Sequence, residues 1–429
     1  MQMHLSRRRF LAASAGLTLP ALLPSAVWSA RGQNAPGERL RFGYIGVGKQ
    51  GRHLLHSFLP HENVQVVAVN DVDTTRREYH RKLVEDFYST RTGKPWKGCA
   101  AYRDFRELLA RDDIDAVVIA TPDHWHALPV IMAARRKKDI YCEKPLSLTI
   151  REAILMVQAV RENRVVFQTG SMQRSDSNFW KGCMLVRNGL IGEVKEVYAN
   201  VGGPSKWCDL PEEPMEPGLD WDMWLGQAPL RPYNSILSPR GVHNHFPRWR
   251  DYREYSGGGM TDWGAHHFDI AQWGLGMDHS GPVEIIPPDG KEFKTLTYIY
   301  ANGARLIHGG LPGYRYGVVF VGTKGKVCVD RGRFAAEPKE LEKVDFGKLP
   351  IQLYRSQNHY VDFTRCIRTR QRPICDVEIG ARSVTVCHLG NLAYWNKRRL
   401  RWDPVAQRFI GDDEANTWLD REKRDPWKI

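Results

Sequence analysis

The stretch that decides the fold is "ERLRFGYIGVGKQGRHLLHSFL", residues 38–59. Residues 41–45 predict a strand, residues 46–51 follow as a G-x-G-x-x-G turn, and the apolar residues of 54–59 recur at helical spacing. In such a turn the first glycine permits the tight bend, the second lets the backbone approach a pyrophosphate, and the third lets the helix pack closely on the strand. The stretch therefore predicts the start of a dinucleotide-binding domain, with the pyrophosphate on the helix N-terminus.

The next strand ends in a carboxylate that bears on the choice of cofactor. Residues 63–71, "NVQVVAVND", predict a strand that ends at Asp71, 20 residues after Gly51. A carboxylate at this place binds the ribose hydroxyls and repels a 2′-phosphate. Asp71 therefore favours NAD over NADP, although Arg76 and Arg77, close behind it, weaken the preference.

Helices and strands continue to alternate after this point. We expect a helix over 102–114, a strand over 115–122, a helix over 126–138 and a strand over 139–145. Strands separated by helices predict a parallel, doubly wound sheet, with ligand groups at the carboxyl ends of its strands. Several polar residues fall at such ends: Thr121, Pro122, His124, His126, Glu143 and Lys144.

Lys144, in "CEKPLSLT" (142–149), is the most informative of these residues. A lysine that faces a cofactor cleft can donate to a substrate hydroxyl or take its proton, because its pKa falls when it is desolvated or near other cations. Considered alone, a Lys-Pro pair is more often a surface feature before a turn.

Four segments together resemble the glucose–fructose oxidoreductase / inositol dehydrogenase (Gfo/Idh/MocA) family, from about residue 38 onward. They are the glycine turn of 46–51, "ATPDHWHA" (120–127), Glu-Lys-Pro (143–145) and "GGGMTDWGAHHFDIAQW" (257–273). In the family's second signature an Asp, and a His four residues later, join the Lys. The resemblance implies that Lys144, Asp262 and His266 are catalytic. The cofactor-binding residues that it implies or supports are Gly46, Gly48, Lys49, Gln50, Gly51, Asp71, Thr121, Pro122, His124, His126, Glu143 and Gln173.

These residue types suit hydride transfer from a carbinol. The reaction needs an acceptor nicotinamide, a base for the hydroxyl proton and a group that stabilises the alkoxide. We assign His266 as the base and Lys144 as the stabilising group. Asp262, four residues before His266, would share a helical face with it and fix its tautomer. The alternative, with Lys144 as the base beside Asp262, stays open.

The resemblance also implies the fold class and the domains. We expect an α/β chain with an N-terminal Rossmann doubly wound parallel sheet and a C-terminal α+β domain with an open, mainly antiparallel sheet. The second domain serves substrate contact and association, so a homo-oligomer is expected. The boundaries are a signal and linker at 1–37, the NAD(P)-binding domain at 38–170 and the second domain at 171–429.

Three residues of the second domain are assigned to the substrate: Arg174, Trp224 and His267. Aromatic faces suit the apolar faces of sugar rings, which favours Trp224 among the many tryptophans of 170–275. His267, together with His243, His245 and Asp262, would be the material for a metal site. No carboxylate cluster accompanies these residues and the family uses no metal, so we expect no metal site. We assign His267 instead to hydrogen bonds with sugar hydroxyls.

The N-terminus raises a question about location. Residues 6–11, Ser-Arg-Arg-Arg-Phe-Leu, match the twin-arginine export pattern, and the apolar run at 10–23 is short and rich in small residues for a membrane span. We therefore expect a periplasmic or otherwise exported protein, tethered to the membrane if the signal is not cleaved. The alternative is a basic N-terminus with no targeting role.

The distribution of charge and the spacing of the cysteines bear on possible partners and disulfides. The formal net charge is +13, but the lysines and arginines are scattered and no nucleic-acid-binding motif occurs, so we expect no nucleic-acid partner. The eight cysteines form no C-x-x-C pair. Free buried thiols are expected, with a Cys366–Cys375 disulfide as the alternative.

An exported dinucleotide enzyme has no soluble pool to reoxidise its cofactor, so we expect NAD loaded before export and tightly held. Three schemes fit: oxidation of one sugar and reduction of another, transient oxidation within one glycoside leading to its hydrolysis, or electron transfer to an unidentified partner. The rivals are a non-enzymatic exported sugar-binding protein and an ordinary dehydrogenase with exchanging NAD.

Overall fold

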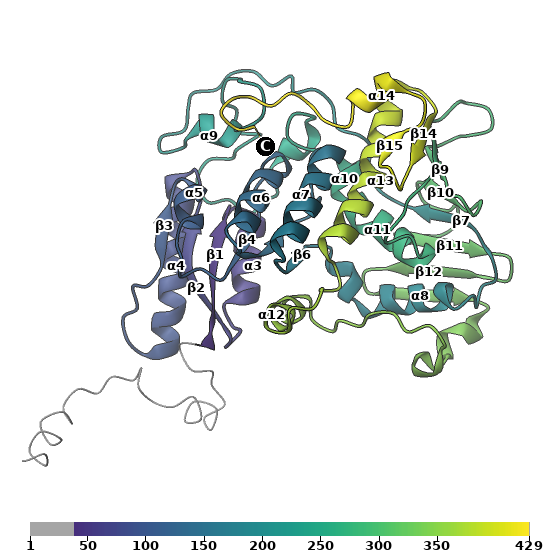
Figure 1. Cartoon of the computed structure of the whole chain (residues 1–429), viewed down its shortest axis with the longest axis horizontal. Coiled ribbons are helices and arrows are strands. Elements are labelled where there is room, and N and C mark those ends of the chain that lie inside the picture. Colours follow the sequence, from purple (N-terminus) through teal and green to yellow (C-terminus); the bar gives the residue numbers. More distant parts are fainter. Residues whose placement is uncertain (1–37, 429) are drawn as a thin grey trace, which may run out of the picture.

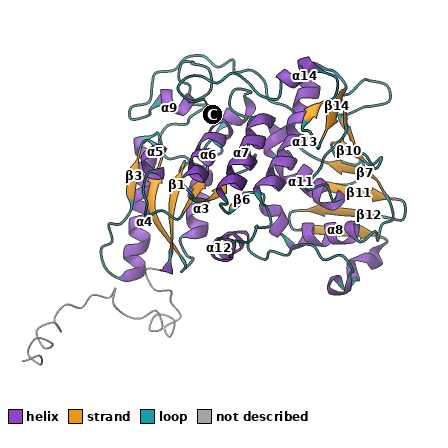
Figure 2. Cartoon of the chain, viewed as in Figure 1, coloured by secondary structure: helices purple, strands orange, loops and turns teal. Residues whose placement is uncertain are grey.

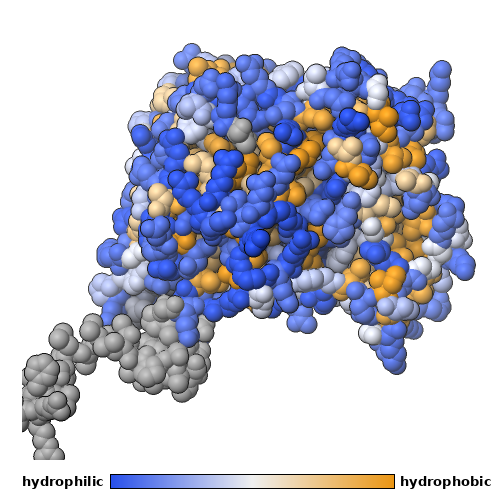
Figure 3. Space-filling view, in the orientation of Figure 1, coloured by the Kyte–Doolittle hydropathy of each residue, from blue (hydrophilic) through white to orange (hydrophobic). Residues whose placement is uncertain are grey.

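The computed structural model describes residues 38–428, in which two sheets lie on either side of a layer of helices (Figure 1). The export signal predicted for residues 1–37 lies outside the described residues. The face seen in Figure 3 is mainly hydrophilic, with more apolar residues on the side of the second sheet. No helix of residues 38–428 combines the length and apolar character that crossing a membrane requires.

The first sheet has six parallel strands in the order β3-β2-β1-β4-β5-β6. Each strand follows the previous one through a crossover, which places all the carboxyl ends at one edge. The strands are β1 (Leu40–Ile45), β2 (Val64–Asn70), β3 (Ala100–Tyr102), β4 (Ala116–Ile119), β5 (Asp139–Cys142) and β6 (Phe167–Thr169).

Both faces of this sheet are covered, as the pattern of β4 illustrates. Ala116 and Val118 belong to a core shared with α3, α4 and α12, whereas Val117 and Ile119 belong to a core shared with α5, α6, α7 and α13. Successive side chains of a strand point to opposite faces, so a strand covered on both faces is apolar throughout. The helices are α3 (Lys49–Phe58), α4 (Thr74–Thr92), α5 (Phe105–Leu109), α6 (Ala127–Arg135), α7 (Ile150–Asn163), α12 (His359–Thr369) and α13 (Val377–Asn396).

The second sheet has nine strands in the order β13-β12-β11-β7-β10-β9-β8-β14-β15. Only β10 and β7 pair in parallel, and the other neighbours are antiparallel. Helices α8 (Ser177–Arg187), α11 (Gly264–Leu275) and α13 share its core. The strands are β7 (Val194–Ala199), β8 (Glu284–Ile286), β9 (Thr297–Ile299), β10 (Arg305–His308), β11 (Val318–Gly322), β12 (Lys326–Asp330), β13 (Arg333–Glu337), β14 (Leu400–Asp403) and β15 (Arg408–Phe409).

The predicted fold class is confirmed: a parallel Rossmann sheet is followed by a mainly antiparallel one. Two details differ from expectation. The helix expected over 102–114 is the shorter α5, and α12 and α13, from the predicted second domain, complete the cover of the first sheet. The eight cysteines are free thiols.

Residues 204–258, which we call the strap, leave the second sheet and run over the first domain (Figures 1 and 2). Its helices are only α9 (Trp221–Leu225) and the 3-10 turn η6 (Arg248–Asp251). Its apolar residues form a small core of their own, made largely of aromatic side chains. Directly after the strap come α10 (Gly259–Asp262) and α11. Shorter elements elsewhere are η4 (Asp123–Trp125), η5 (Met172–Ser175), η7 (Lys339–Lys343), η8 (Phe346–Lys348) and α14 (Asp413–Thr417).

Candidate functional site

A cleft of about 360 Å³ lies at the carboxyl ends of the first sheet's strands, with the strap as its opposite wall. Its lining runs from the glycine turn after β1 and Asp71 after β2 to Lys144 after β5, and on the other side includes Pro239, Phe246 and Trp249 of the strap. Ligands of open α/β sheets bind at this edge. One continuous cleft therefore joins the predicted cofactor turn and the predicted catalytic residues.

The three glycines of the turn have different surroundings. Gly46 has φ +82°, and a Cβ there would come within 2.8 Å of the Thr121 nitrogen. A Cβ on Gly51 would come within 2.3 Å of the Gly46 carbonyl oxygen, whereas a Cβ on Gly48 would meet nothing within 4 Å. Gly48 is the N-cap of α3 and has no side-chain cap, so the first-turn N–H groups stay available for an anion. Gly46 and Gly51 thus serve the fold, and Gly48 leaves room beside a helix N-terminus for a phosphate.

Asp71 and Arg76 lie in the same part of the cleft. The Asp71 carboxylate accepts from the backbone N–H groups of Val47 and Asp73, both at 3.0 Å. Arg76 donates to the Gly241 carbonyl at 2.9 Å, to Ser238 Oγ at 3.2 Å and to the Pro239 carbonyl, all in the strap. Because those acceptors engage its guanidinium, Arg76 is committed to the strap.

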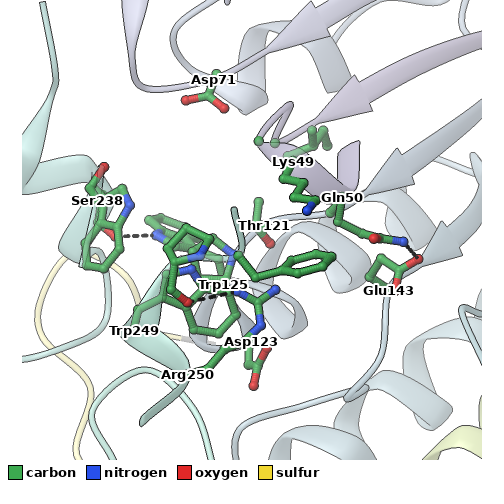
Figure 4. Close-up of a pocket in the computed structure, with 18 of the residues that line it drawn as sticks. Lys49, Gln50, Asp71, Thr121, Asp123, Trp125, Glu143, Ser238, Trp249 and Arg250 are labelled. Carbon is green, nitrogen blue, oxygen red and sulfur yellow. Dashed lines mark hydrogen bonds between the residues drawn. The ribbon is translucent and has the colours of Figure 1, made fainter. Parts of the chain in front are cut away.

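The middle of the cleft contains four more of the predicted cofactor-binding residues (Figure 4). Gln50 Nε2 donates to Glu143 Oε1 at 3.0 Å, and burial raises the pKa of Glu143. Lys49 Nζ lies 4.4 Å from the centre of the Phe246 ring of the strap. The Thr121 hydroxyl is buried and has no protein partner, so it is available to a ligand.

His124 and His126 are buried behind the cleft and do not line it, contrary to their prediction as cofactor-binding residues. His124 Nε2 lies 3.0 Å from the Trp224 carbonyl, and the His126 ring lies between the carbonyls of Pro145, at 2.8 Å, and Thr121, at 3.0 Å. Burial lowers their pKa values to about 3 and about 4, so both rings are neutral. His126 therefore joins the loops that carry Thr121 and Lys144, and His124 joins its own loop to the strap.

Lys144 and Asp262 form the charged centre of the cleft. Lys144 Nζ lies 2.6 Å from Asp262 Oδ1 and donates to the Asp262 carbonyl at 2.9 Å. Burial raises the pKa of Asp262, but Lys144 and Arg250 outweigh it, so the net pKa is lowered. Asp262 was expected to hold the His266 ring. It meets Lys144 instead, because α10 ends at Asp262 and His266 belongs to the separate helix α11.

His266 lines the cleft with an imidazole whose Nδ1 is buried and unpartnered. Burial and the nearby Lys144 lower its pKa well below the usual value, so the ring is neutral. Gln173, with its amide placed to satisfy both of its atoms, donates to the His266 carbonyl and accepts from Arg331 Nε, each at 3.1 Å. Gln173 does not line the cleft and instead braces residues that do.

The structure corrects the assignment of Arg174 to the substrate. Its side chain is 1% exposed and lies outside the cleft, where it donates to both carboxylate oxygens of Asp269 at 2.8 Å and to those of Asp278 at 2.7 and 3.0 Å. No local pattern marks these partners, which come close to Arg174 only in the fold. Arg174 therefore joins η5 to α11 and the turn after it.

His267 and Trp224, the other two predicted substrate residues, have different positions. His267 does not line the cleft, and its Nδ1 lies 2.7 Å from the Asn200 carbonyl. Trp224 does line it, but one face of its indole stacks on Trp221, with ring centres 4.6 Å apart. Of the two, only Trp224 is placed to meet a ligand.

Three charged lining residues were not assigned to the site from the sequence: Asp123, Arg250 and Arg331. Asp123 is inside "ATPDHWHA" and comes directly after the loop that follows β4, so its position at a strand end was the available signal. Burial raises its pKa to about 7. Arg250 in η6 and Arg331 after β12 reach the cleft from distant segments, and no local pattern marks them.

The strap is tied to the first domain next to the cleft. Arg52 of α3 donates to the His243 carbonyl at 3.0 Å and to Asn244 Oδ1, and Thr74 N donates to the Gly218 carbonyl at 3.0 Å. Together with the Arg76 bonds, these contacts hold the strap across the glycine turn and Asp71.

Within residues 38–428, no group of three His, Cys, Asp or Glu side chains is arranged to hold a metal ion. His243 and His245 lie against each other, with ring centres 4.9 Å apart. The His267 ring contacts the Asn200 carbonyl, and Asp262 pairs with Lys144. The four residues considered for a metal site therefore do not come together.

Comparisons with known proteins agree with this geometry. Residues 40–171 match the family model "Oxidoreductase family, NAD-binding Rossmann fold", and residues 196–429 match "Oxidoreductase family, C-terminal alpha/beta domain" of the same Gfo/Idh/MocA series. The myo-inositol 2-dehydrogenase of Thermotoga maritima is 24% identical over 85% of this chain and 99% of its own. The 2,7-anhydro-N-acetylneuraminate hydratase of Escherichia coli is 26% identical over 68% of each. A solved aldose-aldose oxidoreductase of Caulobacter crescentus shares the fold, with a TM-score of 0.56 at 17% identity over 85% of this chain and 99% of that one.

Proposed function

The chain belongs to the Gfo/Idh/MocA oxidoreductase family, with an NAD-binding Rossmann domain, and from this premise we propose that it oxidises a carbohydrate hydroxyl with a nicotinamide dinucleotide that stays bound. The observation that carries the proposal is the single cleft that joins an open glycine turn to Lys144, Asp262 and His266 beneath the strap.

The residues present fit a dinucleotide. Gly48 and the uncapped start of α3 suit a pyrophosphate, and Asp71 suits ribose hydroxyls. Arg76, the cation closest along the chain that would suit a 2′-phosphate, is engaged by the strap, which supports NAD over NADP. When bound, the nicotinamide supplies the hydride acceptor and donor.

The protein side chains then handle the proton and the charge. The neutral His266, with Nδ1 free of protein partners, suits the base that takes the hydroxyl proton. Lys144, oriented by Asp262 through a 2.6 Å ion pair, suits the stabilisation of the developing alkoxide. This geometry favours His266 over Lys144 as the base.

The strap supports the retained cofactor. Residues 238–250 include the strap residues that line the cleft across from the glycine turn and Asp71, and hydrogen bonds from Arg52 and Arg76 of the first domain hold them there. A dinucleotide in the cleft would lie under this wall, so its exit would require the strap to open. Retention fits the twin-arginine pattern of residues 6–11, and we propose that the protein is exported with its dinucleotide already in place.

A second candidate is a redox-neutral reaction, in which oxidation, elimination, water addition and reduction occur on one glycoside. The likeness to a hydratase favours it, since water addition is part of that cycle. A non-enzymatic sugar-binding protein is disfavoured, because binding alone does not need a partly buried lysine–carboxylate pair beside an imidazole whose Nδ1 has no protein partner.

The test is release of the cofactor by denaturation. We expect NAD or NADH in near-equal molar amount with purified protein, identified by chromatography. A panel of glycosides is then added to native protein while cofactor absorbance, keto-sugar and free sugar are followed. A purified protein that neither contains nor binds a dinucleotide contradicts the proposal.

A further inference from the structure

Two carboxyl groups line the cleft in opposite environments. Asp262 has Lys144 Nζ at 2.6 Å and Arg250 Nε at 3.8 Å, so it is an ion-paired carboxylate. Asp123 is 3% exposed, and no salt bridge to it is formed within residues 38–428. Its carboxyl partner is the Ser256 hydroxyl, 2.6 Å from Oδ2. When environments separate two carboxyl groups in this way, one suits the acid role and the other the ionised role.

The position of Asp123 places it where a substrate would lie. It opens η4, directly after Pro122 in the loop that follows β4, and it lines the cleft from the first domain together with Trp125, near Trp249 and Arg250 of the strap (Figure 4). Ser256, its partner, is followed after three residues by α10, which ends in Asp262. The same segment therefore holds Asp123 and presents Asp262.

We propose that Asp123 is the proton donor to the departing oxygen of a glycoside, which makes the redox-neutral form of the proposed function the working reaction of this site. The inference rests on the proposed function, because the elimination requires prior oxidation of the sugar. Asp123 acts on the leaving group, a task for which Lys144 and His266 are not needed.

The steps balance as follows. With a nicotinamide bound as the acceptor, the carbinol C–H would leave as hydride while its O–H proton passes to His266, which leaves a carbonyl. A base in the cleft takes the proton from the carbon next to that carbonyl, and the C–O bond on the following carbon breaks with its electron pair going to oxygen. Asp123 gives its proton to that oxygen. Water then adds to the resulting double bond: its oxygen bonds to the carbon that lost the leaving group, its proton goes to Asp123, and the base returns its proton to the neighbouring carbon. The hydride would return to the carbonyl carbon while His266 returns its proton to the carbonyl oxygen, so that one water is consumed with no net oxidation.

The surroundings of Asp123 set its protonation. Burial is the largest cause and raises its pKa; the Ser256 hydrogen bond, Arg250 of η6 and Lys144 lower the pKa, Asp262 of α10 raises it, and the net pKa is about 7. Asp123 is thus protonated below neutral pH, and a step that needs its proton slows as the pH rises through about 7.

The first test measures protonation in the resting protein. Infrared difference spectra between wild type and Asp123→Asn, titrated from about pH 5 to about pH 9, should show a carboxylic acid band that fades near neutral pH. An Asp123 that is already ionised at about pH 5 overturns the proposal.

The second test uses pairs of 4-nitrophenyl and methyl glycosides of glucose, galactose and N-acetylgalactosamine, in both anomers. Methoxide is a poor leaving group and needs a proton, whereas 4-nitrophenolate leaves without one. Asp123→Asn should slow methanol release by about 10²–10⁴-fold and nitrophenol release by less than about 10-fold. Ser256→Ala keeps the Asp123 carboxyl but removes a hydrogen bond that lowers its pKa, so the pH at which methanol release declines should rise. Asp209→Asn changes an exposed carboxylate of the strap and should match wild type.

The outcomes separate two failures. The role of Asp123 is overturned if the wild type reduces its cofactor with a glycoside but releases no aglycone. It is also overturned if Asp123→Asn slows the release of methanol and of nitrophenol equally. In both cases the proposed oxidoreductase activity stands. If no glycoside of the panel reduces the cofactor of the wild type, the proposed function is contradicted and this role with it.

Discussion

The two walls of the cleft are held together in different ways. The wall on the first sheet follows parallel strands. At positions such as Gly46 and Gly51 the backbone packs so closely on neighbouring backbone that a Cβ would clash with it. The strap has few regular elements, and single side chains such as Arg52 and Arg76 tie it down. A rigid wall orients a cofactor, whereas a wall held by few bonds can open to admit or release one. The difference assigns orientation of the cofactor to the first wall and its access to the second.

The largest expected effect is on the chemical step, which needs Lys144 of the rigid wall and His266 of α11. Lys144→Ala and His266→Ala should each slow reduction of the bound cofactor by about 10²–10⁴-fold, because one removes the alkoxide stabiliser and the other the base. Single-turnover absorbance of the cofactor measures the rate, and circular dichroism checks the fold. Lys206→Ala, an exposed lysine of the strap, is the control. Near wild-type turnover in either variant contradicts its role.

The next effect tests the corrected position of Arg174. Removing it leaves the buried Asp269 and the partly exposed Asp278 without their cation, so Arg174→Ala should lower the free energy of unfolding by about 3–5 kcal/mol. The folded fraction should keep its KM, since the side chain lies outside the cleft. Denaturant melts and steady-state kinetics measure both, and Arg333→Ala, an exposed ion-paired arginine, is the control. A raised KM with unchanged stability would restore the substrate role.

The glycines sharpen the comparison within one turn. Gly51→Ala should cost about 1–3 kcal/mol of stability, because its Cβ would press on the Gly46 carbonyl at 2.3 Å. Gly48→Ala has free space around its Cβ in the protein, so it should spare stability and weaken dinucleotide binding instead. Thermal melts and calorimetric titration with NAD separate the two effects. Equal loss of stability in both variants would show that Gly48 serves the fold alone.

The rigid wall was largely predictable from the sequence and the strap was not. The glycine turn, Asp71, Thr121 and Lys144 are marked by their places at strand ends, and periodic apolar patterns locate those strands. Arg250, Arg331 and the partners of Arg174 come together only through tertiary packing between distant segments. The Asp262–His266 pair illustrates the same limit, because the break between α10 and α11 turns Asp262 toward Lys144. Spacing along the chain indicates which residues matter, and packing decides which of them meet.

The smallest expected effect is on the strap. Arg52→Ala removes the bonds to His243 and Asn244 at a partly exposed position, so it should speed release of bound dinucleotide by about 3–10-fold without changing the hydride-transfer rate. Stopped-flow displacement of NADH, followed by its fluorescence, measures release. Arg248→Ala is the matched control, because that arginine is exposed and pairs with Asp251 inside the strap. If both variants release NADH at the wild-type rate while hydride transfer slows in Arg52→Ala, the strap orients the reactants rather than retaining them, and the division of labour between the two walls fails.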